Sequence, residues 1–247
     1  MQDGQPAVRL VLQLALTAEE REWVRRICRE KHYKRQEVHG RARPVSYLVV
    51  REEGWLLADG TFRVEQRERV GILVFARMQS SRCKGWYGNS KDVACKWAKQ
   101  TQWEMLVLSR CWLDPRIQKQ GEWYIPKAAS LIIKKSLESI GYHYLLLRPP
   151  AYLDRPFEIK EVISYCDRER FLCMMYWFAR FRLVRENEAG LRTYARALPP
   201  LTDGQRRHIL EASRLDKAAR QKRLANLIHA PIQEVFLLKR RARRFAA

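Results

Sequence analysis

The chain has 247 residues, of which 47% are apolar and eight are Trp. This composition excludes a disordered chain, and the length allows a full hydrophobic core in one domain or one and a half. A formal net charge of +21 and a pI near 10.1 predict an anionic partner. Nucleic acid is the first candidate because the basic residues are interleaved with Trp, Tyr and Phe, although ribosomal and membrane-surface proteins also fit the charge alone.

The sequence favours a cytoplasmic protein. It has no run of eighteen apolar residues, and its opening carries an early acid and no basic start, unlike a signal peptide. The cysteines show no CxxC pairs and lie mostly in apolar runs, which predicts buried reduced thiols rather than a disulfide framework or a zinc site. They are Cys28, Cys83, Cys95, Cys111, Cys166 and Cys173, and Cys83 alone lies in a polar segment.

Strands and one helix are predicted for the first third of the chain. Residues 8–16 alternate well enough for a strand. Thr17 and Glu20 then form a capping box, which predicts a helix to about Arg29 or Lys31 with one core face and one basic face. Further strands are predicted at 45–50, 54–58 and 70–76, with an antiparallel pair around the turn at Asp59-Gly60.

Two polar segments interrupt this pattern. Residues 30–44 carry His32 and Tyr33, a pair that we interpret as phosphate-binding surface rather than a metal site. In residues 78–100, aromatic rings lie among cations, so that bases could stack while the cations hold phosphates. The nucleic-acid contacts predicted there are Arg82, Lys84, Trp86 and Tyr87. An equal alternative is that the two rings pin this loop onto the core.

The second half is predicted to contain a central strand, helices and further strands. Residues 103–113 are almost continuously apolar, which is typical of a strand covered on both faces. Pro126 is expected to open a helix that Gly141 ends, followed by a strand at 142–148. Residues 162–184 indicate strand, turn, helix and strand, and a last strand is predicted at 191–198.

Residues 199–247 form a separate basic extension after a domain of residues 1–198. From residue 201 onward there are twelve Lys or Arg against four acids. We expect one or two basic helices, broken near Pro231. The dense arginines near the end favour phosphate contact over a solubilising tail, and those concerned are Arg240, Arg241, Arg243 and Arg244.

Asp167 is the first candidate functional residue. It follows the apolar run 162–166 at the predicted carboxyl end of a strand, just before a helix. Ligands of α/β proteins gather at such strand ends, and the start of a helix attracts negative charge. The alternative is that Asp167 only caps the helix.

The order of these elements resembles the GNAT acyltransferase fold, a mixed central sheet flanked by helices. The sequence is also similar to a narrower group, the Mom DNA-modification proteins of phage Mu and related prophages. The resemblance rests on three pieces between residues 10 and 198: His32-Tyr33 after the first helix, Leu108-Ser109-Arg110 followed by Trp112 and Asp114-Pro115, and Ser164-Tyr165-Cys166-Asp167 with Tyr176 nine residues on.

This resemblance implies transfer of a carbamoylmethyl group to the exocyclic N6 amine of adenine in double-stranded DNA, with an iron centre suggested for the family. The catalytic residues that it implies are His32, Tyr33, Asp167 and Tyr176, with Ser109 and Arg110 as cofactor-binding residues. His32 and Asp167 are the implied ligands of Fe(II), because histidine nitrogen and carboxylate oxygen suit that ion. A duplex adenine would be flipped onto an aromatic ring such as that of Trp86, Tyr87 or Tyr176.

Two departures from the family pattern put this activity in question. Phe171 stands where the family commonly has a His, so that His39 or Cys173 would have to supply a third metal ligand. The usual acetyl-CoA loop is not recognised either, because 116–121 has the wrong spacing and Ala128-Ala129-Ser130 stands where glycines would be. The donor of the transferred group is therefore unknown.

Two hypotheses of different classes follow. The first is a DNA-modifying transferase, and the second is a catalytically impaired GNAT-like protein that only binds nucleic acid. The first predicts that His32 and Asp167 lie near each other at one mouth of the sheet.

Overall fold

The computed structural model describes residues 4–32, 44–77, 104–118, 124–148, 158–167, 174–186, 190–216, 218–219 and 232–236. For Asp167 and residues 232–236 it describes the backbone alone.

Eight strands of the described chain form one sheet, in the order β6-β7-β5-β4-β3-β2-β1-β8. Every neighbouring pair is antiparallel except β4 and β5, which run parallel. The strands are β1 Gly4–Leu14, β2 Val45–Leu57, β3 Phe62–Arg77, β4 Met105–Leu113, β5 Glu161–Asp167, β6 Arg182–Glu186, β7 Leu191–Ala197 and β8 Ile232–Phe236. This sheet confirms the predicted α/β fold class with a mixed central sheet.

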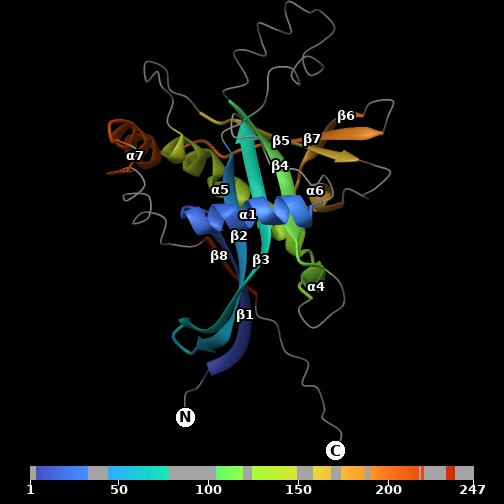
Figure 1. The fold of residues 1–247 in the computed structure, drawn as a ribbon, viewed down its shortest axis with the longest axis vertical. Helices are drawn as coiled ribbons and strands as arrows, with labels where there is room; N and C mark the ends of the chain where they lie inside the picture. Colours follow the sequence, from blue (N-terminus) through green and yellow to red (C-terminus); the bar gives the residue numbers. More distant parts are fainter. Residues whose placement is uncertain are drawn as a thin grey trace, which may run out of the picture.

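Helices cover both faces of the sheet (Figure 1). The first face carries α1, which packs Val24, Ile27 and Cys28 onto a small apolar cluster of β1 to β3. The larger core lies on the other face, beneath α5, α6 and α7. The helices are α1 Ala18–Glu30, α4 Pro115–Gln118, α5 Ala128–Leu147, α6 Met174–Phe178 and α7 Asp203–Ser213.

The start of α1 is set by its own sequence. The Thr17 hydroxyl accepts from the Glu20 amide at 3.1 Å, and the Glu20 carboxylate accepts from the Thr17 amide at 2.9 Å. The predicted capping box is therefore confirmed, and the exposed arginines of α1 face away from the core as expected.

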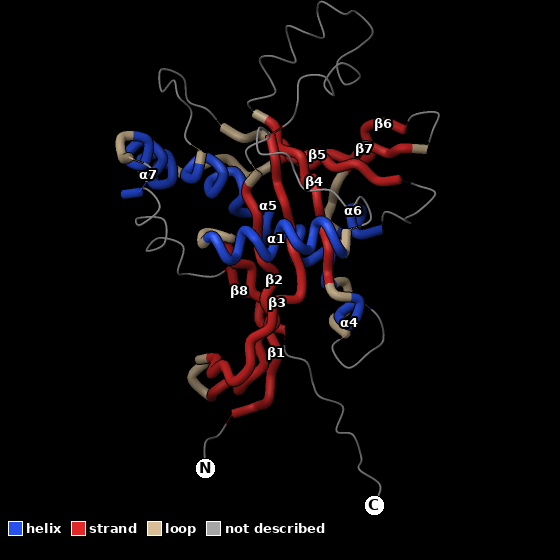
Figure 2. The backbone as a smooth tube through the Cα atoms, viewed as in Figure 1, coloured by secondary structure: helices blue, strands red, loops and turns tan. Residues whose placement is uncertain are grey.

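The hairpin of β2 and β3 is longer than predicted and, with β1, reaches past the helices (Figure 2). The predicted turn is present, with Gly60 at φ +82°. Charged residues had divided β2 into two predicted strands, yet it runs unbroken. Glu52, 4% exposed, is held by Arg9 at 2.6 Å on one neighbouring strand and by Arg67 at 2.9 Å on the other, so that its charge is compensated across the sheet.

Two predictions about α5 were wrong. The helix passes through Gly141 and ends at Leu147, so residues 142–147 are helix and not a strand. Pro126 lies before the helix, whose N-cap is Lys127. The apolar stripe simply continues to Tyr144, which is 5% exposed, and Gly141 lies where α5 passes Ile159 and Leu198 closely.

The C-terminal extension contains both a helix and a strand. The predicted helical character holds for α7, which begins with a capping box of Thr202 and Gln205. Beyond Pro231, where a further helix was expected, β8 pairs antiparallel with β1. The outer edge of β1 offers backbone groups that a strand can satisfy, and this outweighs local helical preference.

One cysteine differs from its prediction. Cys166 is disulfide-bonded, whereas Cys28 and Cys111 are free thiols as expected. Of the helices in the described ranges, none combines the length and apolar character needed to cross a lipid bilayer.

Candidate functional site

The ladder between β4 and β5 stops partway along both strands. Residues 105–108 of β4 pair with 161–164 of β5, and the last matched pair is Leu108 with Ser164. Beyond it β4 continues beside β3, while β5 continues beside β7, and the two strands separate (Figure 1). We call this place the β4–β5 fork and define it by Leu108, Ser109 and Ser164. Separating parallel strands leave backbone groups for a ligand at their carboxyl side.

A β-bulge coincides with the fork. Arg110 lies opposite Val74 of β3 and Leu108 lies opposite Phe75, so Ser109 is the extra residue. The Arg110 side chain donates to the Ser109 carbonyl at 2.8 Å. Bulges commonly redirect residues beside active sites, which supports Ser109 and Arg110 as candidate binding residues.

A buried pair of hydroxyl groups closes the fork on the α5 side of the sheet. The Ser164 hydroxyl lies 3.2 Å from the Leu108 carbonyl and 2.8 Å from the Tyr176 hydroxyl. Because the carbonyl can only accept, Ser164 donates to it and Tyr176 donates to Ser164. Both side chains are buried, at 0% and 4% exposure.

Aromatic packing holds Tyr176 in this position. Its ring stacks on Tyr194 of β7 with centroids 5.2 Å apart, and meets Phe181 edge-on at 5.4 Å. Such pairs restrict the ring, so α6 presents the phenol oxygen to the fork in one orientation.

The end of α1 lies beside the end of β4. His32, 5% exposed, directly follows α1, and its amide donates to the Ile27 carbonyl at 3.1 Å. At the end of β4, a hydrogen bond from Arg116 lowers the pKa of Asp114, and the charge of Lys31 lowers it further. His32 therefore follows a helix that ends near the carboxyl end of β4. β5 ends at Asp167. Because β5 runs parallel to β4, the carboxyl ends of the two strands point in the same direction along the sheet.

The predicted proximity of His32 and Asp167 stays a prediction, because the Asp167 side chain lies outside the described residues. The same holds for several other predicted positions, which lie wholly outside them: Tyr33, His39, Arg82, Lys84, Trp86, Tyr87, Phe171, Cys173, Arg240, Arg241, Arg243 and Arg244. Within the described ranges, no three His, Cys, Asp or Glu side chains are grouped to hold a metal ion.

Cys111 lies on β4 beyond the bulge. Burial raises the pKa of its thiol to about 12, so the thiol stays protonated at neutral pH. A protonated thiol is a weak nucleophile, so the raised pKa disfavours Cys111 as a nucleophile.

Sequence reasoning missed Ser164 and Tyr194 as parts of the site. Ser164 was named only as part of the resembling segment Ser164-Tyr165-Cys166-Asp167, and no role was predicted for its hydroxyl. Its one signal was strand alternation, which puts it on the same face as Val162 and Cys166. Its partners Leu108 and Tyr176 come from other elements.

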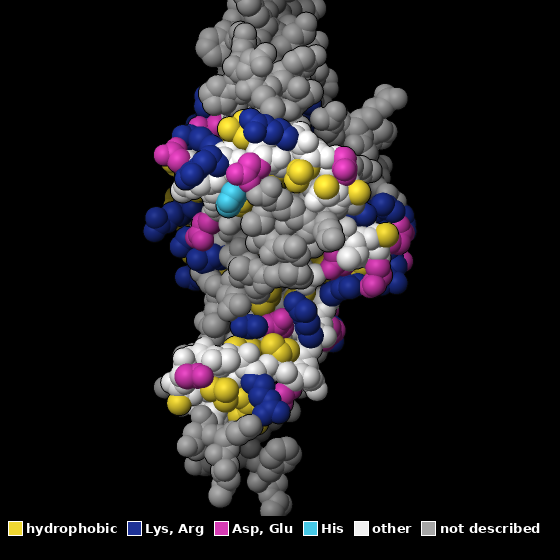
Figure 3. All heavy atoms as spheres, turned by 90° about the vertical axis from the view of Figure 1, so that its left-hand side faces the viewer, with side chains coloured by type: hydrophobic (Ala, Val, Ile, Leu, Met, Phe, Trp, Pro, Cys, Tyr) yellow, Lys and Arg dark blue, Asp and Glu magenta, His cyan; other side chains and the backbone are white. Residues whose placement is uncertain are grey.

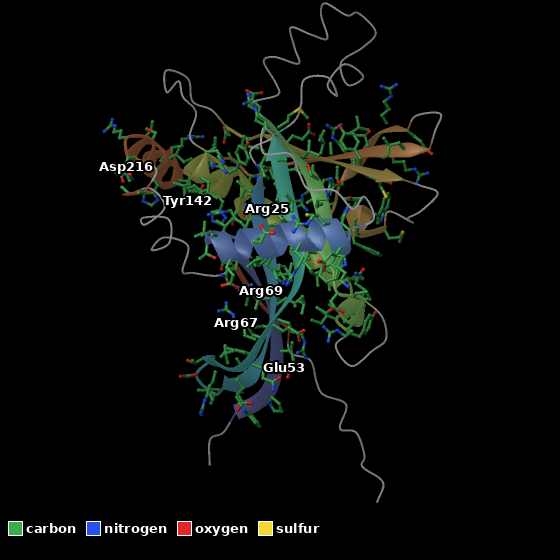
Figure 4. All side chains as sticks on the ribbon, in the orientation of Figure 1. Arg25, Glu53, Arg67, Arg69, Tyr142 and Asp216 are labelled. Atoms are coloured by element: carbon green, nitrogen blue, oxygen red, sulfur yellow. The ribbon has the colours of Figure 1, made fainter. Side chains whose placement is uncertain are left out.

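Described charges on the face seen in Figure 3 are mixed. Lys and Arg lie there beside Asp and Glu, with apolar side chains between them. Figure 4, in the orientation of Figure 1, shows the labelled Arg25, Arg67 and Arg69 at and below α1, and Glu53 farther along the hairpin of β2 and β3. The excess positive charge of the chain is therefore not gathered into one patch on that described face.

In the described chain, the order of elements and the parallel pair of β4 and β5 among antiparallel neighbours define a mixed α/β protein. Neither a protein-family model nor a curated protein sequence matches the chain. Among solved structures it is similar to a GNAT-family acetyltransferase from Listeria monocytogenes, with a TM-score of 0.32 and 13% identity over 60% of this chain and 64% of that one. The chain thus spans less than two thirds of that protein, and so distant a likeness assigns no activity.

Proposed function

We propose that the chain is a DNA-modifying transferase that adds a carbamoylmethyl-type group to the N6 amine of adenine. The observation that carries this proposal is the β4–β5 fork, where the Ser164 hydroxyl contacts both the Leu108 carbonyl and the buried phenol of Tyr176. The net charge of +21 supports a polyanionic substrate.

Tyr176 is proposed as the acid of the reaction. As the adenine nitrogen bonds to the transferred carbon, the bond from that carbon to the donor breaks, and the departing atom needs a proton. The Tyr176 O–H, donated to Ser164 in the structure, turns to the departing atom when the donor binds and supplies this proton. Asp167 is the proposed acceptor of the proton that the amine releases.

The other predicted residues are proposed to bind and orient. Ser109 and Arg110, at the bulge, hold the donor beside the fork. His32 follows α1 and is proposed to act together with Tyr33, and the iron implied by the resemblance would be held by His32 with Asp167. Histidine and carboxylate suit Fe(II), although the described side chains supply only the histidine.

The alternative function is nucleic-acid binding without catalysis. It is favoured by Phe171, which stands where the resembling family has a His. In that case the fork and the basic residues persist, and the chemistry is lost.

Replacing Tyr176 by Phe is expected to lower adenine modification about 100-fold or more, because a positioned proton donor contributes at least that factor. The measurement is mass spectrometry of nucleosides from DNA of cells that express each variant. Tyr142→Phe is the matched control, because its phenol bonds to His208 at 3.0 Å between α5 and α7 rather than at the fork.

Equal modification in Tyr176→Phe and wild type would remove Tyr176 from the reaction. Unmodified DNA in wild-type cells, combined with tight DNA binding by the purified protein, would replace the transferase by the binding alternative. Circular dichroism of each variant excludes misfolding as the cause of a loss.

A second substitution tests the metal. If the wild type is inactive, Phe171→His is expected to restore adenine modification together with iron in the purified protein, because it completes a set of two His and one carboxylate. Metal content is measured by mass spectrometry of the protein digest. A Phe171→His protein that gains neither metal nor activity would argue against the implied iron centre.

A further inference from the structure

The outer side of α6 exposes aromatic rings. Tyr176 points into the core, but its neighbours Trp177 and Phe178 are 72% and 44% exposed, and Met174 is 49% exposed. Large exposed apolar side chains gathered on one short helix indicate a binding surface.

Cations with unusual backbone geometry border these rings. Lys127 places its ammonium 4.7 Å from the centroid of the Phe178 ring. Arg180 lies two residues beyond the end of α6, and its amide donates to the Trp177 carbonyl at 2.9 Å. Among the described residues, Lys127 and Arg180 are the two non-glycine residues with positive φ, at 58° and 60°.

A left-handed position normally takes Gly or Asn, because a β-carbon costs free energy there. Here both such positions carry long basic side chains beside the same helix. Retention of a strained residue is typical of a functional surface. This pattern indicates that the positive charges of Lys127 and Arg180 serve a function that offsets the backbone strain at these two positions.

Positive charge is also concentrated next to α6. Arg196 of β7 donates to the Ala179 carbonyl, and its pKa is lowered by burial and then by the nearby charge of Arg180. Residues 174–182 contain no acid. Among the described side chains, Glu138 raises the pKa of Arg196 and Glu161 binds Arg182 at 2.8 Å. An anion near Arg180 would relieve this repulsion.

We propose that Trp177, Phe178, Lys127 and Arg180 form a surface that binds single-stranded nucleic acid, with a base stacked on Trp177 and phosphates held by the two cations. We call it the α6 surface. Exposed rings bordered by cations match the two repeating features of a nucleic-acid strand. The inference rests on the part of the proposed function that makes the partner a nucleic acid, and it places that partner on the helix that supplies Tyr176.

The test measures binding of a labelled oligothymidylate by fluorescence anisotropy at several salt concentrations. Trp177→Ala is expected to weaken binding roughly 5- to 100-fold without changing the salt dependence, because it removes stacking alone. Arg180→Gly is expected to lower the slope of log affinity against log salt by about 0.7, the loss of one phosphate contact on a single strand.

The thermal stability of Arg180→Gly shows whether a loss of binding could come from misfolding. Glycine suits a φ of 60°, so the thermal midpoint of this variant should equal or exceed that of wild type. Two controls match the changes: Leu210→Ala removes an apolar side chain, 43% exposed, from α7, and Arg26→Ala removes a cation from α1 on the opposite face of the sheet. Neither should change affinity or slope.

Several outcomes would overturn the inference. They are absence of oligonucleotide binding by wild type, unchanged binding by Trp177→Ala, and equal slope loss in Arg26→Ala. A wild-type dimer that Trp177→Ala dissociates, with nucleic-acid binding intact, would make the α6 surface a contact between copies of the chain instead. RNA and duplex DNA of matched length show which form of nucleic acid is preferred.

These results separate this inference from the transferase proposal. Wild type that binds the strand through Trp177 but leaves adenine unmodified keeps the α6 surface and removes the transferase. If wild type modifies DNA while Trp177→Ala binds the strand normally, the transferase proposal is kept and the α6 surface is removed.

Discussion

Gly71→Ala is expected to destabilise the protein by about 2 to 3 kcal/mol, because it overpacks the centre of the sheet. Gly71 lies on β3, opposite Val49 of β2 and Leu113 of β4. An added β-carbon would lie 2.4 Å from the Leu113 Cδ2 atom and 2.7 Å from the Trp112 carbonyl oxygen. The Leu113 side chain can rotate aside, but the carbonyl belongs to the β4 backbone and is held by the ladder.

The measurement is urea unfolding of each variant. Gly204→Ala is the matched control, because only the Thr202 hydroxyl lies near its added carbon, at 3.9 Å, and alanine suits the first turn of α7. We expect that control to be neutral or slightly more stable. A Gly71→Ala protein within about 0.5 kcal/mol of wild type would show that β3 and β4 can separate without cost.

The second large expected effect is a loss of stability at acid pH. His143 of α5 is largely buried against the sheet, with its Nδ1 atom 2.8 Å from the Tyr47 hydroxyl, and burial lowers its pKa to about 4. Burial also raises the pKa of Tyr47, so the phenol stays neutral. The folded protein therefore holds a neutral imidazole over a range in which the unfolded chain takes up a proton.

Between pH 6.5 and about 4 the unfolded state binds more protons than the folded state, so the free energy of unfolding falls as the pH falls. The loss is at most about 3 kcal/mol, complete near the lower pKa. Well above pH 6.5 neither state is protonated at His143 and this contribution is constant.

His143→Gln should flatten the stability profile in this window, because glutamine does not titrate yet can still bond to Tyr47. Tyr47→Phe should keep the slope, because burial and not the hydrogen bond causes the shift. Urea unfolding at several pH values between 4 and 7 measures both. A His143→Gln profile parallel to that of wild type would assign the acid sensitivity to other groups.

The candidate site could be predicted only in part. Tyr176 and Ser109 were candidates because of a resemblance, and the structure puts both at the fork. Ser164 was missed, because the Tyr176 hydroxyl that it meets lies 12 residues away and the Leu108 carbonyl 56 residues away. No local pattern encodes such a meeting. The exposure of Trp177 could not be predicted either, because an apolar run that includes Tyr176 predicts burial of every side chain in it.

The sequence by itself determined the features whose partners lie within a few residues. Two such features are the capping box of Thr17 and Glu20 and the hairpin turn at Gly60. Both satisfy backbone groups locally, so both could be predicted from the residues alone. Much of the strand and helix order followed from apolar periodicity, and with it the mixed α/β fold class.

Tertiary structure decided what depends on distant surfaces. Gly141 looked like the end of a helix, but the apolar stripe of α5 continues to Tyr144 because the sheet beneath it buries that side chain. Residues 232–236 became a strand because β1 had an edge to pair with. The fork, the bulge at Ser109 and the exposed rings of α6 arose in the same way, since each depends on which strand or helix lies next to it, and free energies of packing between elements outweigh local preference.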